Sequence, residues 1–205
     1  RTLRSQLAAF CYLLTEPDVN PRGSMVHLGN PNMPINRFFA LAIAASLIPD
    51  HPLAGQWLRV SQDYVRFKLA MNTAPGGAWS ELISYFVAGY SHQLQASAVM
   101  SKNMAFDPAV ARLAVMPTRF TLNLLTPPDP RQNGLRIVPG WGHEGQFRFN
   151  HWLVAAALIR DADPELAKAF AWAWQQQGKP VSEPSFMEHG SGFTPRVAVH
   201  ADLLQ

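Results

Sequence analysis

The chain has 205 residues, of which 48% are hydrophobic and 15% charged. That length is enough for one domain with a real core, and the composition excludes a disordered chain. A formal net charge of +3 is too small and too scattered for a nucleic-acid-binding surface. The longest apolar run, residues 38–48, is too short to span a membrane. The single cysteine, Cys11, excludes a disulfide framework and a thiolate metal cluster, and we expect it to be a buried apolar residue.

Helical periodicity recurs along most of the chain, and 17 prolines and 13 glycines stand between the periodic stretches. Because proline is costly inside a helix, we expect these prolines to separate helices rather than interrupt them. Asp107-Pro108 and Asp163-Pro164 are typical helix starts, an N-cap followed by proline in the first turn. The predicted helices are 3–14, 34–47, 52–71, 80–101, 107–123, 144–160 and 163–178.

The predicted fold class is all-α. From the second helix onward the helices form three antiparallel pairs, joined by short links within a pair. The first member of each pair is apolar on most sides, whereas the helices at 52–71 and 163–178 carry more charge on one face. This order predicts an incomplete α/α toroid over residues 1–178, with an inner and an outer row of helices. Residues 179–205 are then a linker, with a candidate strand at 196–200. A simple orthogonal bundle is the alternative.

In a toroid the inner helices run in the same direction, so their N-terminal ends share one rim. Helix N-termini present free backbone N–H groups and a partial positive charge, which suit an anionic ligand. A tryptophan at such a rim suits a sugar ring, because it is flat, apolar and donates one hydrogen bond. Polar clusters precede all three inner helices, and their candidate binding residues are Asn30, Asn32, Arg37, Trp79, Glu81, Tyr85, Trp141 and His143.

Several of these residues also have a purely structural interpretation. Asn32 suits a helix cap, and Glu81 suits a first-turn acid that complements the helix dipole. Tyr85 suits a core tyrosine with a satisfied hydroxyl group, and Arg37 suits an ordinary ion pair. The remaining histidines in helices, His92 and His151, are expected to be packed rather than catalytic. No metal site is predicted, since His189 and His200 lack partners at metal-ligand spacing.

Four stretches resemble the heparinase II/III-like polysaccharide lyases, a group that includes alginate and oligoalginate lyases. They are Gly29-Asn-Pro-Asn-Met-Pro-Ile-Asn-Arg37, Pro49-Asp-His-Pro52, Gly77-Ala-Trp-Ser-Glu81-x-x-x-Tyr85 and Val138-Pro-Gly-Trp-Gly-His-Glu-Gly145. The order and spacing of the four stretches agree with the family, and the resemblance covers about residues 20–178.

The resemblance implies β-elimination at a uronic acid of an acidic polysaccharide, without a cofactor. It implies that Asn32, with Asn30 as its neighbour, neutralises the substrate carboxylate and that Tyr85 acts on protons. Arg37, Trp79, Glu81, Trp141 and His143 would then contact substrate. The resemblance further implies a periplasmic or extracellular location. It also implies a β-sandwich domain of the same parent protein, which would supply another histidine, and a helical region longer than this chain.

The residue types suit that chemistry. The proton on C5 of a uronate is weakly acidic, because the adjacent carboxylate resists further negative charge. Neutral or cationic donors such as Asn32 and Arg37 would stabilise the charge that develops there. A tyrosine is a poor base unless its surroundings lower its pKa, so base and acid remain unassigned. Two other functions stay open: a toroid glycoside hydrolase using Glu81 and Glu144, and a non-catalytic carbohydrate-binding module.

Overall fold

The computed structural model describes residues 2–16, 35–80, 83–139 and 151–180. The described part is helical, with no β-strand in it apart from two isolated bridges, Thr73 with Trp79 and Asp129 with Leu135. The all-α prediction is therefore confirmed for these residues. The helices are α1 (Thr2–Thr15), α2 (Ile35–Ser46), α3 (Ala54–Asn72), α4 (Ile83–Asn103), α5 (Pro108–Leu122), the short 3₁₀ helix η2 (Pro130–Gln132), α6 (His151–Ile159) and α7 (Pro164–Gln176). The candidate strand at 196–200 lies outside the described residues.

Local sequence signals account for several helix ends. The Asp107 side chain accepts a hydrogen bond from the Ala109 N–H at 2.8 Å, and the Asp163 side chain accepts one from the Leu166 N–H at 3.0 Å. Each cap therefore satisfies one of the backbone donors that a helix leaves unpaired in its first turn. The α3 helix begins at Ala54, two residues later than predicted. The Ala54 N–H donates a hydrogen bond to the His51 carbonyl, so residues 51–54 form a turn that precedes the helix.

Pro117 contradicts the expectation that prolines only separate helices. It lies inside α5 and is buried there. A proline at this position removes one helical hydrogen bond, a cost that the burial of the surrounding side chains offsets. Its neighbours Ala114, Val115 and Thr118 are all buried, so this stretch of α5 is part of the core.

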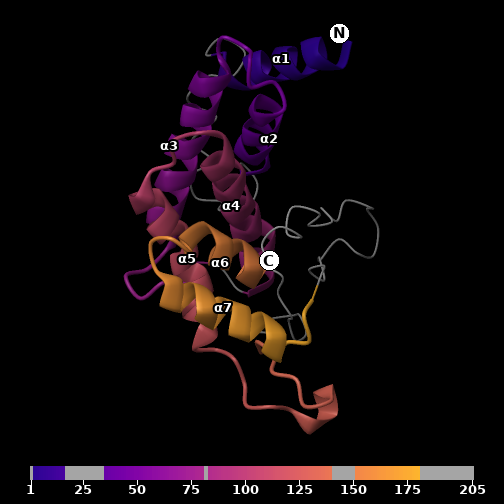
Figure 1. Cartoon of the computed structure of the whole chain (residues 1–205), viewed down its shortest axis with the longest axis vertical. Helices are drawn as coiled ribbons and strands as arrows, with labels where there is room; N and C mark the ends of the chain where they lie inside the picture. The colour runs from indigo at the N-terminus through magenta and orange to yellow at the C-terminus, as the bar shows by residue number, and fades with distance from the viewer. Residues whose placement is uncertain (1, 17–34, 81–82, 140–150, 181–205) are drawn as a thin grey trace.

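The helices from α2 to α7 form two rows. In the first row α2 contacts α4 and α4 contacts α6, and in the second row α3 contacts α5 and α5 contacts α7. Each first-row helix also packs against the helix that follows it in the chain, so successive hairpins lie side by side along the long axis (Figure 1). The α1 helix packs mainly on α2, at one end of this arrangement.

Aromatic side chains join the two rows. The Phe38 ring of α2 stacks on the Tyr64 ring of α3 with 3.6 Å between centroids. The buried Tyr90 hydroxyl of α4 donates a hydrogen bond to the Ala114 carbonyl of α5 at 2.5 Å. In the last pair, the Trp152 indole N–H of α6 donates to Gln177 Oε1 at 2.8 Å. These contacts fix each hairpin's two helices against one another.

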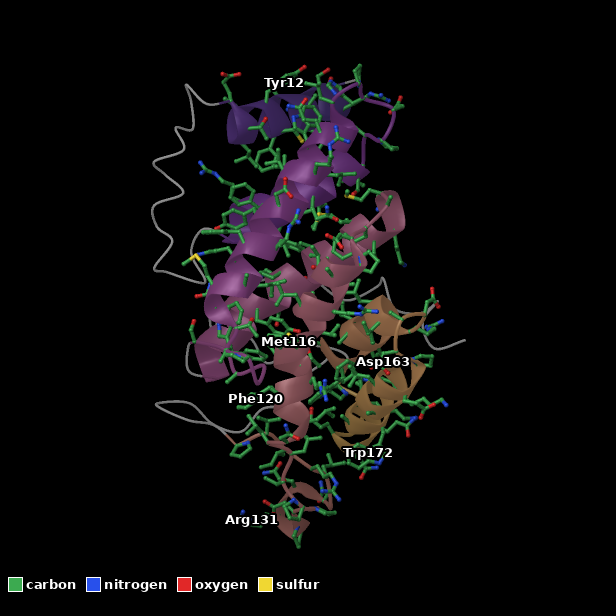
Figure 2. The ribbon with its side chains drawn as sticks, turned by 90° about the vertical axis from the view of Figure 1, so that its left-hand side faces the viewer. Tyr12, Met116, Phe120, Arg131, Asp163 and Trp172 are labelled. Carbon is green, nitrogen blue, oxygen red and sulfur yellow. The ribbon has the colours of Figure 1, made fainter. Side chains whose placement is uncertain are left out.

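The link between α5 and α6 begins with a hairpin-like turn that contains η2. The Asp129 N–H donates to the Leu135 carbonyl at 3.0 Å, and the Thr126 N–H donates to the Ile137 carbonyl at 2.9 Å. Arg131, on η2, lies at one end of the molecule, and Tyr12 of α1 lies at the other (Figure 2). The described part of this link therefore lies far from α1.

Candidate substrate-binding rim

The first-row helices begin at the same end of their row. The α2 and α3 helices are antiparallel, because Phe38 near the start of α2 contacts Tyr64 while Ser46 at its end lies close to the first turns of α3. The Ser80 N–H, which precedes α4, donates to the carbonyl of Asn72 at the end of α3 (2.8 Å). Thus α2 and α4 both begin beside the C-terminal half of α3.

The α6 helix begins at this end as well. Its first residue, His151, has its ring edge-on to the rings of Phe86 and Tyr90, in the first half of α4 (5.6 and 6.0 Å between centroids). We call the end at which α2, α4 and α6 begin the N-terminal rim. This is the end of the molecule at which the sequence predicts that polar residues distant in the chain come together.

Most of the predicted site residues lie outside the described part of the chain. This group consists of Asn30, Asn32, Glu81, Trp141 and His143. Tyr85 is the third residue of α4, so its backbone is at the N-terminal rim. Half-buried His92 follows it by seven residues, about two turns further along α4. The roles assigned to these residues stay predictions.

Arg37 is half-buried in the first turn of α2 and carries its charge close to Tyr64. Burial raises the pKa of the Tyr64 hydroxyl well above its ordinary value, and the Arg37 charge works against that rise. The Tyr64 hydroxyl is buried and has no hydrogen-bond partner among the residues that the structure describes. The α3 helix therefore places a neutral phenol next to the cation that the sequence singled out.

Trp79 packs into the core at the N-terminal rim. Only 9% of the residue is exposed, and its ring lies 6.4 Å from that of Phe86 and 5.8 Å from that of Tyr90. An antiparallel bridge with Thr73 holds its backbone beside the end of α3. In this arrangement Trp79 supports the first turns of α4, and the prediction that it contacts a sugar ring stays a prediction.

Two polar residues of α3 at this rim were missed by the sequence analysis. Lys68 is fully buried, and Asn72 is 7% exposed. The Asn72 side chain donates to the Lys68 carbonyl at 2.9 Å and accepts from the Ser80 hydroxyl at 3.0 Å. Helical spacing signals the burial of Lys68, because it falls on one face with the buried residues Trp57, Ser61 and Tyr64.

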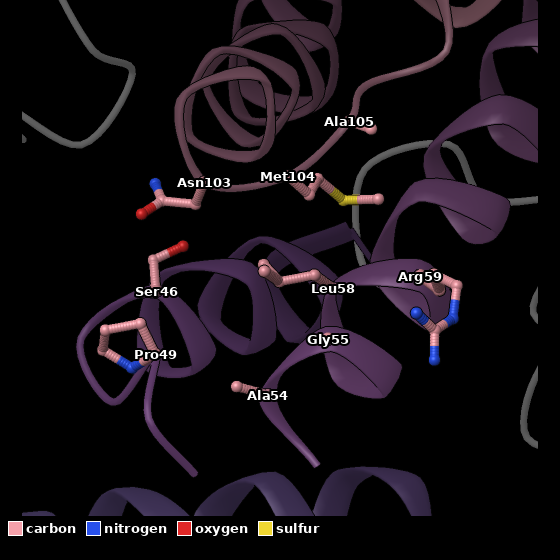
Figure 3. Close-up of a pocket in the computed structure, with 9 residues that line it drawn as sticks. All are labelled: Ser46, Pro49, Ala54, Gly55, Leu58, Arg59, Asn103, Met104 and Ala105. Carbon is pink, nitrogen blue, oxygen red and sulfur yellow. The ribbon is translucent and has the colours of Figure 1, made fainter. Parts of the chain in front are cut away.

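A pocket of about 360 Å³ lies at the opposite end, where α2 and α4 finish and α3 begins (Figure 3). Its lining residues are Ser46, Pro49, Ala54, Gly55, Leu58, Arg59, Asn103, Met104 and Ala105. The neighbouring Pro49–Pro52 link is held in place by its own contacts. Asp50 pairs with Arg4, which lowers the pKa of the Asp50 carboxyl group, and the His51 ring stacks on Trp57 at 4.6 Å. None of the predicted site residues in the described segments lines this pocket.

Other chemistry finds little support in the described residues. Cys11 is buried as expected, and burial raises the pKa of its thiol to about 11. No group of three histidine, cysteine or carboxylate side chains gathers anywhere in the described segments in a way that would hold a metal ion. None of the described helices is both long and apolar enough to cross a membrane.

The chain matches no protein-family model, no curated protein and no solved structure.

Proposed function

We propose that the chain is the helical part of a polysaccharide lyase that cleaves a uronate-containing glycan by β-elimination. The observation that carries the proposal is the common N-terminal rim, at which α2, α4 and α6 begin together. Three helix N-termini at one end favour an anionic ligand, because unpaired N–H groups and the helix dipoles add positive potential there.

The fold that we propose for this part is an incomplete α/α toroid. The two rows support it. In one row α2 contacts α4 and α4 contacts α6, and in the row beside it α3 contacts α5 and α5 contacts α7. The charged side chains of α3 and α7 also support an outer position. Each of these helices carries an exposed ion pair between residues three apart, Asp63 with Arg66 and Glu165 with Lys168.

In the proposed reaction Asn32, assisted by Arg37, neutralises the carboxylate of the uronate in the bound substrate. Neutralisation stabilises the negative charge that develops as the C5 proton leaves. Tyr85 acts as the acid or base on the proton that is transferred. The bond from C4 to its glycosidic oxygen then breaks, the departing oxygen takes up a proton to become a hydroxyl group, and a C4–C5 double bond forms. The position of Tyr85 in the first turns of α4 supports this role, since it shares the rim with Arg37.

The partners and location follow from the same proposal. The ligand is an acidic polysaccharide or oligosaccharide, and a β-sandwich domain of the same parent protein supplies a further histidine. An enzyme that degrades such polymers acts in the periplasm or outside the cell. These statements rest on the sequence resemblance, and the rim geometry supports only the choice of an anionic ligand.

The test is the ultraviolet absorbance of the unsaturated uronate during incubation with alginate, heparan sulfate and other acidic glycans. We expect absorbance to rise with at least one glycan, and Tyr85→Phe to lower the rate about 100-fold or more. Tyr12→Phe is the matched control, because Tyr12 lies on α1 and is exposed. It should leave the rate unchanged.

Two outcomes would contradict the lyase proposal, and a third would contradict only the role of Tyr85. New reducing ends without the absorbance would indicate hydrolysis, and binding without product would indicate a carbohydrate-binding module. Full lyase activity in Tyr85→Phe would remove Tyr85 from the reaction while leaving β-elimination in place.

A further inference from the structure

The pocket at the end of the molecule opposite the N-terminal rim has the features of a small-molecule site. It lies where α2 and α4 finish and α3 begins, and its volume is about 360 Å³. Sites for small molecules are concave and mostly apolar, with a few polar groups that fix the orientation of the ligand. This pocket is at the lower end of their size range, so it suits a ligand of one sugar ring rather than a long chain.

Apolar side chains make up the middle of this pocket. Leu58 and Ala54 are buried, so the packing of the core holds them in place. Pro49 and Met104 extend the apolar surface around Leu58 (Figure 3). Such a surface favours the carbon and hydrogen atoms of a ligand, because contact removes apolar area from water.

Arg59 supplies a positive charge to the pocket, and none of the nine lining residues is acidic. One terminal nitrogen of its guanidinium lies 3.6 Å from the position that a Cβ on Gly55 would take, so the charged group lies against the first turn of α3. Arg59 forms no hydrogen bond or ion pair with any residue in the described segments. Arg66, about two turns further along the same helix, is by contrast paired with Asp63. A free guanidinium favours a carboxylate, which accepts two parallel hydrogen bonds from it.

The other side of the pocket presents hydrogen-bond acceptors. The Ser46 hydroxyl donates its proton to the Ala42 carbonyl at 2.8 Å, so its oxygen offers lone pairs to a ligand. The Asn103 side-chain N–H donates to the Val99 carbonyl at 2.7 Å, which leaves Oδ1 of Asn103 as an acceptor. In Figure 3 Ser46 and Asn103 lie together on one side of the pocket and Arg59 lies on the other. Hydroxyl groups of a ligand are suitable donors to these two oxygens.

We propose that this pocket binds a compact hydroxy acid, with a single uronic acid sugar as its representative. The carboxylate pairs with Arg59, the hydroxyl groups donate to Ser46 and Asn103, and the C–H face of the ring lies on Leu58. The inference goes beyond the proposed reaction and does not depend on it, because the pocket and the N-terminal rim are at opposite ends of the helices.

The test is a titration of the full chain with sodium glucuronate, followed by proton–nitrogen nuclear magnetic resonance of the backbone amides. Gly55 and Ala105 line the pocket and report on it, whereas Ser80 reports on the N-terminal rim. We expect saturable shifts at Gly55 and Ala105. Methyl glucuronate and glucose lack the negative charge, and acetate lacks the hydroxyl groups. Each of these three should bind the pocket about tenfold more weakly than glucuronate, or not at all.

Two variants assign the binding to the pocket. Arg59→Gln removes the charge and should lower the affinity for glucuronate about tenfold, without changing that for the methyl ester. Ala105→Phe adds a ring to the pocket lining and should weaken the binding of every ligand. Both residues are exposed, so neither change disturbs the core, and far-ultraviolet circular dichroism checks this. Arg66→Gln is the matched control, because Arg66 is exposed on the same helix and already paired, and it should bind as wild type.

Several results would overturn the proposal. They are the absence of saturable shifts at Gly55 and Ala105, an equal loss in Arg59→Gln and Arg66→Gln, and methyl ester or glucose binding as tight as that of glucuronate. Shifts at Ser80 alone would place the acid at the N-terminal rim and would also overturn it. The lyase proposal is decided separately, by the formation of unsaturated product, so the two can fail independently.

Discussion

The turn between α3 and α4 offers a sharp test of the packing at the N-terminal rim. Gly77 has a φ of +91°, and a Cβ added there would lie 2.6 Å from the Met116 carbonyl oxygen of α5. Met116 and Phe120, which approach this glycine, are labelled on α5 in Figure 2. Gly77→Ala therefore combines an unfavourable backbone conformation with a clash against a helix backbone that has little freedom to move.

Two other glycines separate these costs. Gly134 has a φ of +77° and open space around its Cβ position, so Gly134→Ala should cost only about 1 kcal/mol of backbone strain. Gly76 has no positive φ, and no described atom lies within 4 Å of its Cβ position, so Gly76→Ala should change the unfolding free energy by less than about 0.5 kcal/mol. Overpacking adds about 1–3 kcal/mol, so Gly77→Ala should cost about 2–4 kcal/mol.

Urea unfolding followed by far-ultraviolet circular dichroism measures all three variants. The expected order of destabilisation is Gly77→Ala, then Gly134→Ala, then Gly76→Ala. If Gly77→Ala costs no more than Gly134→Ala, then the contact with α5 relaxes freely. In that case the close approach of this turn to Met116 is not a constraint on the rim. A large cost for Gly76→Ala would refute the reasoning from φ and space altogether.

Two further predictions concern the core. Tyr90→Phe removes the hydroxyl group that donates to the Ala114 carbonyl, and should lower the unfolding free energy by about 1–2 kcal/mol in urea titrations. Tyr12→Phe, on exposed α1, should cost almost nothing, and equal costs would mean that the α4–α5 hydrogen bond contributes no stability. Burial raises the pKa of the Cys11 thiol from 9.0 to about 11, so the folded state resists its ionisation. The unfolding free energy should therefore fall as the pH rises from 9 towards 11, and should fall less in Cys11→Ala. A parallel fall in both proteins, measured by urea titration at each pH, would contradict the assignment to Cys11.

Helix positions were predictable because their signals are local. The caps at Asp107 and Asp163 and the prolines after them define helix starts through hydrogen bonds within one turn. The buried state of Cys11 also followed from its type and its lack of partners. The prediction that prolines only separate helices was wrong at Pro117, because burial in the core around α5 offsets the energetic cost of a proline inside a helix.

The candidate site was predictable only in outline. Element order was enough to predict that α2, α4 and α6 would begin together. Whether a rim residue is exposed depends on neighbours that are distant in the chain. Trp79 is covered by α4, so its indole is a packing element in this structure. Tyr64 was not among the predicted site residues, but Phe38 at the start of α2 stacks on its ring.

The sequence by itself determined the helical class, the helix order and most helix ends, since these depend on periodicity and capping within a few residues. Only the tertiary structure decided which polar groups are buried at the N-terminal rim, with Lys68 as the clearest case. The reason is physical: burial and electrostatic potential are set by all the elements that pack around a group. The α3 helix, which carries Lys68, packs against α1, α2, α4 and α5, through contacts between residues far apart in the chain.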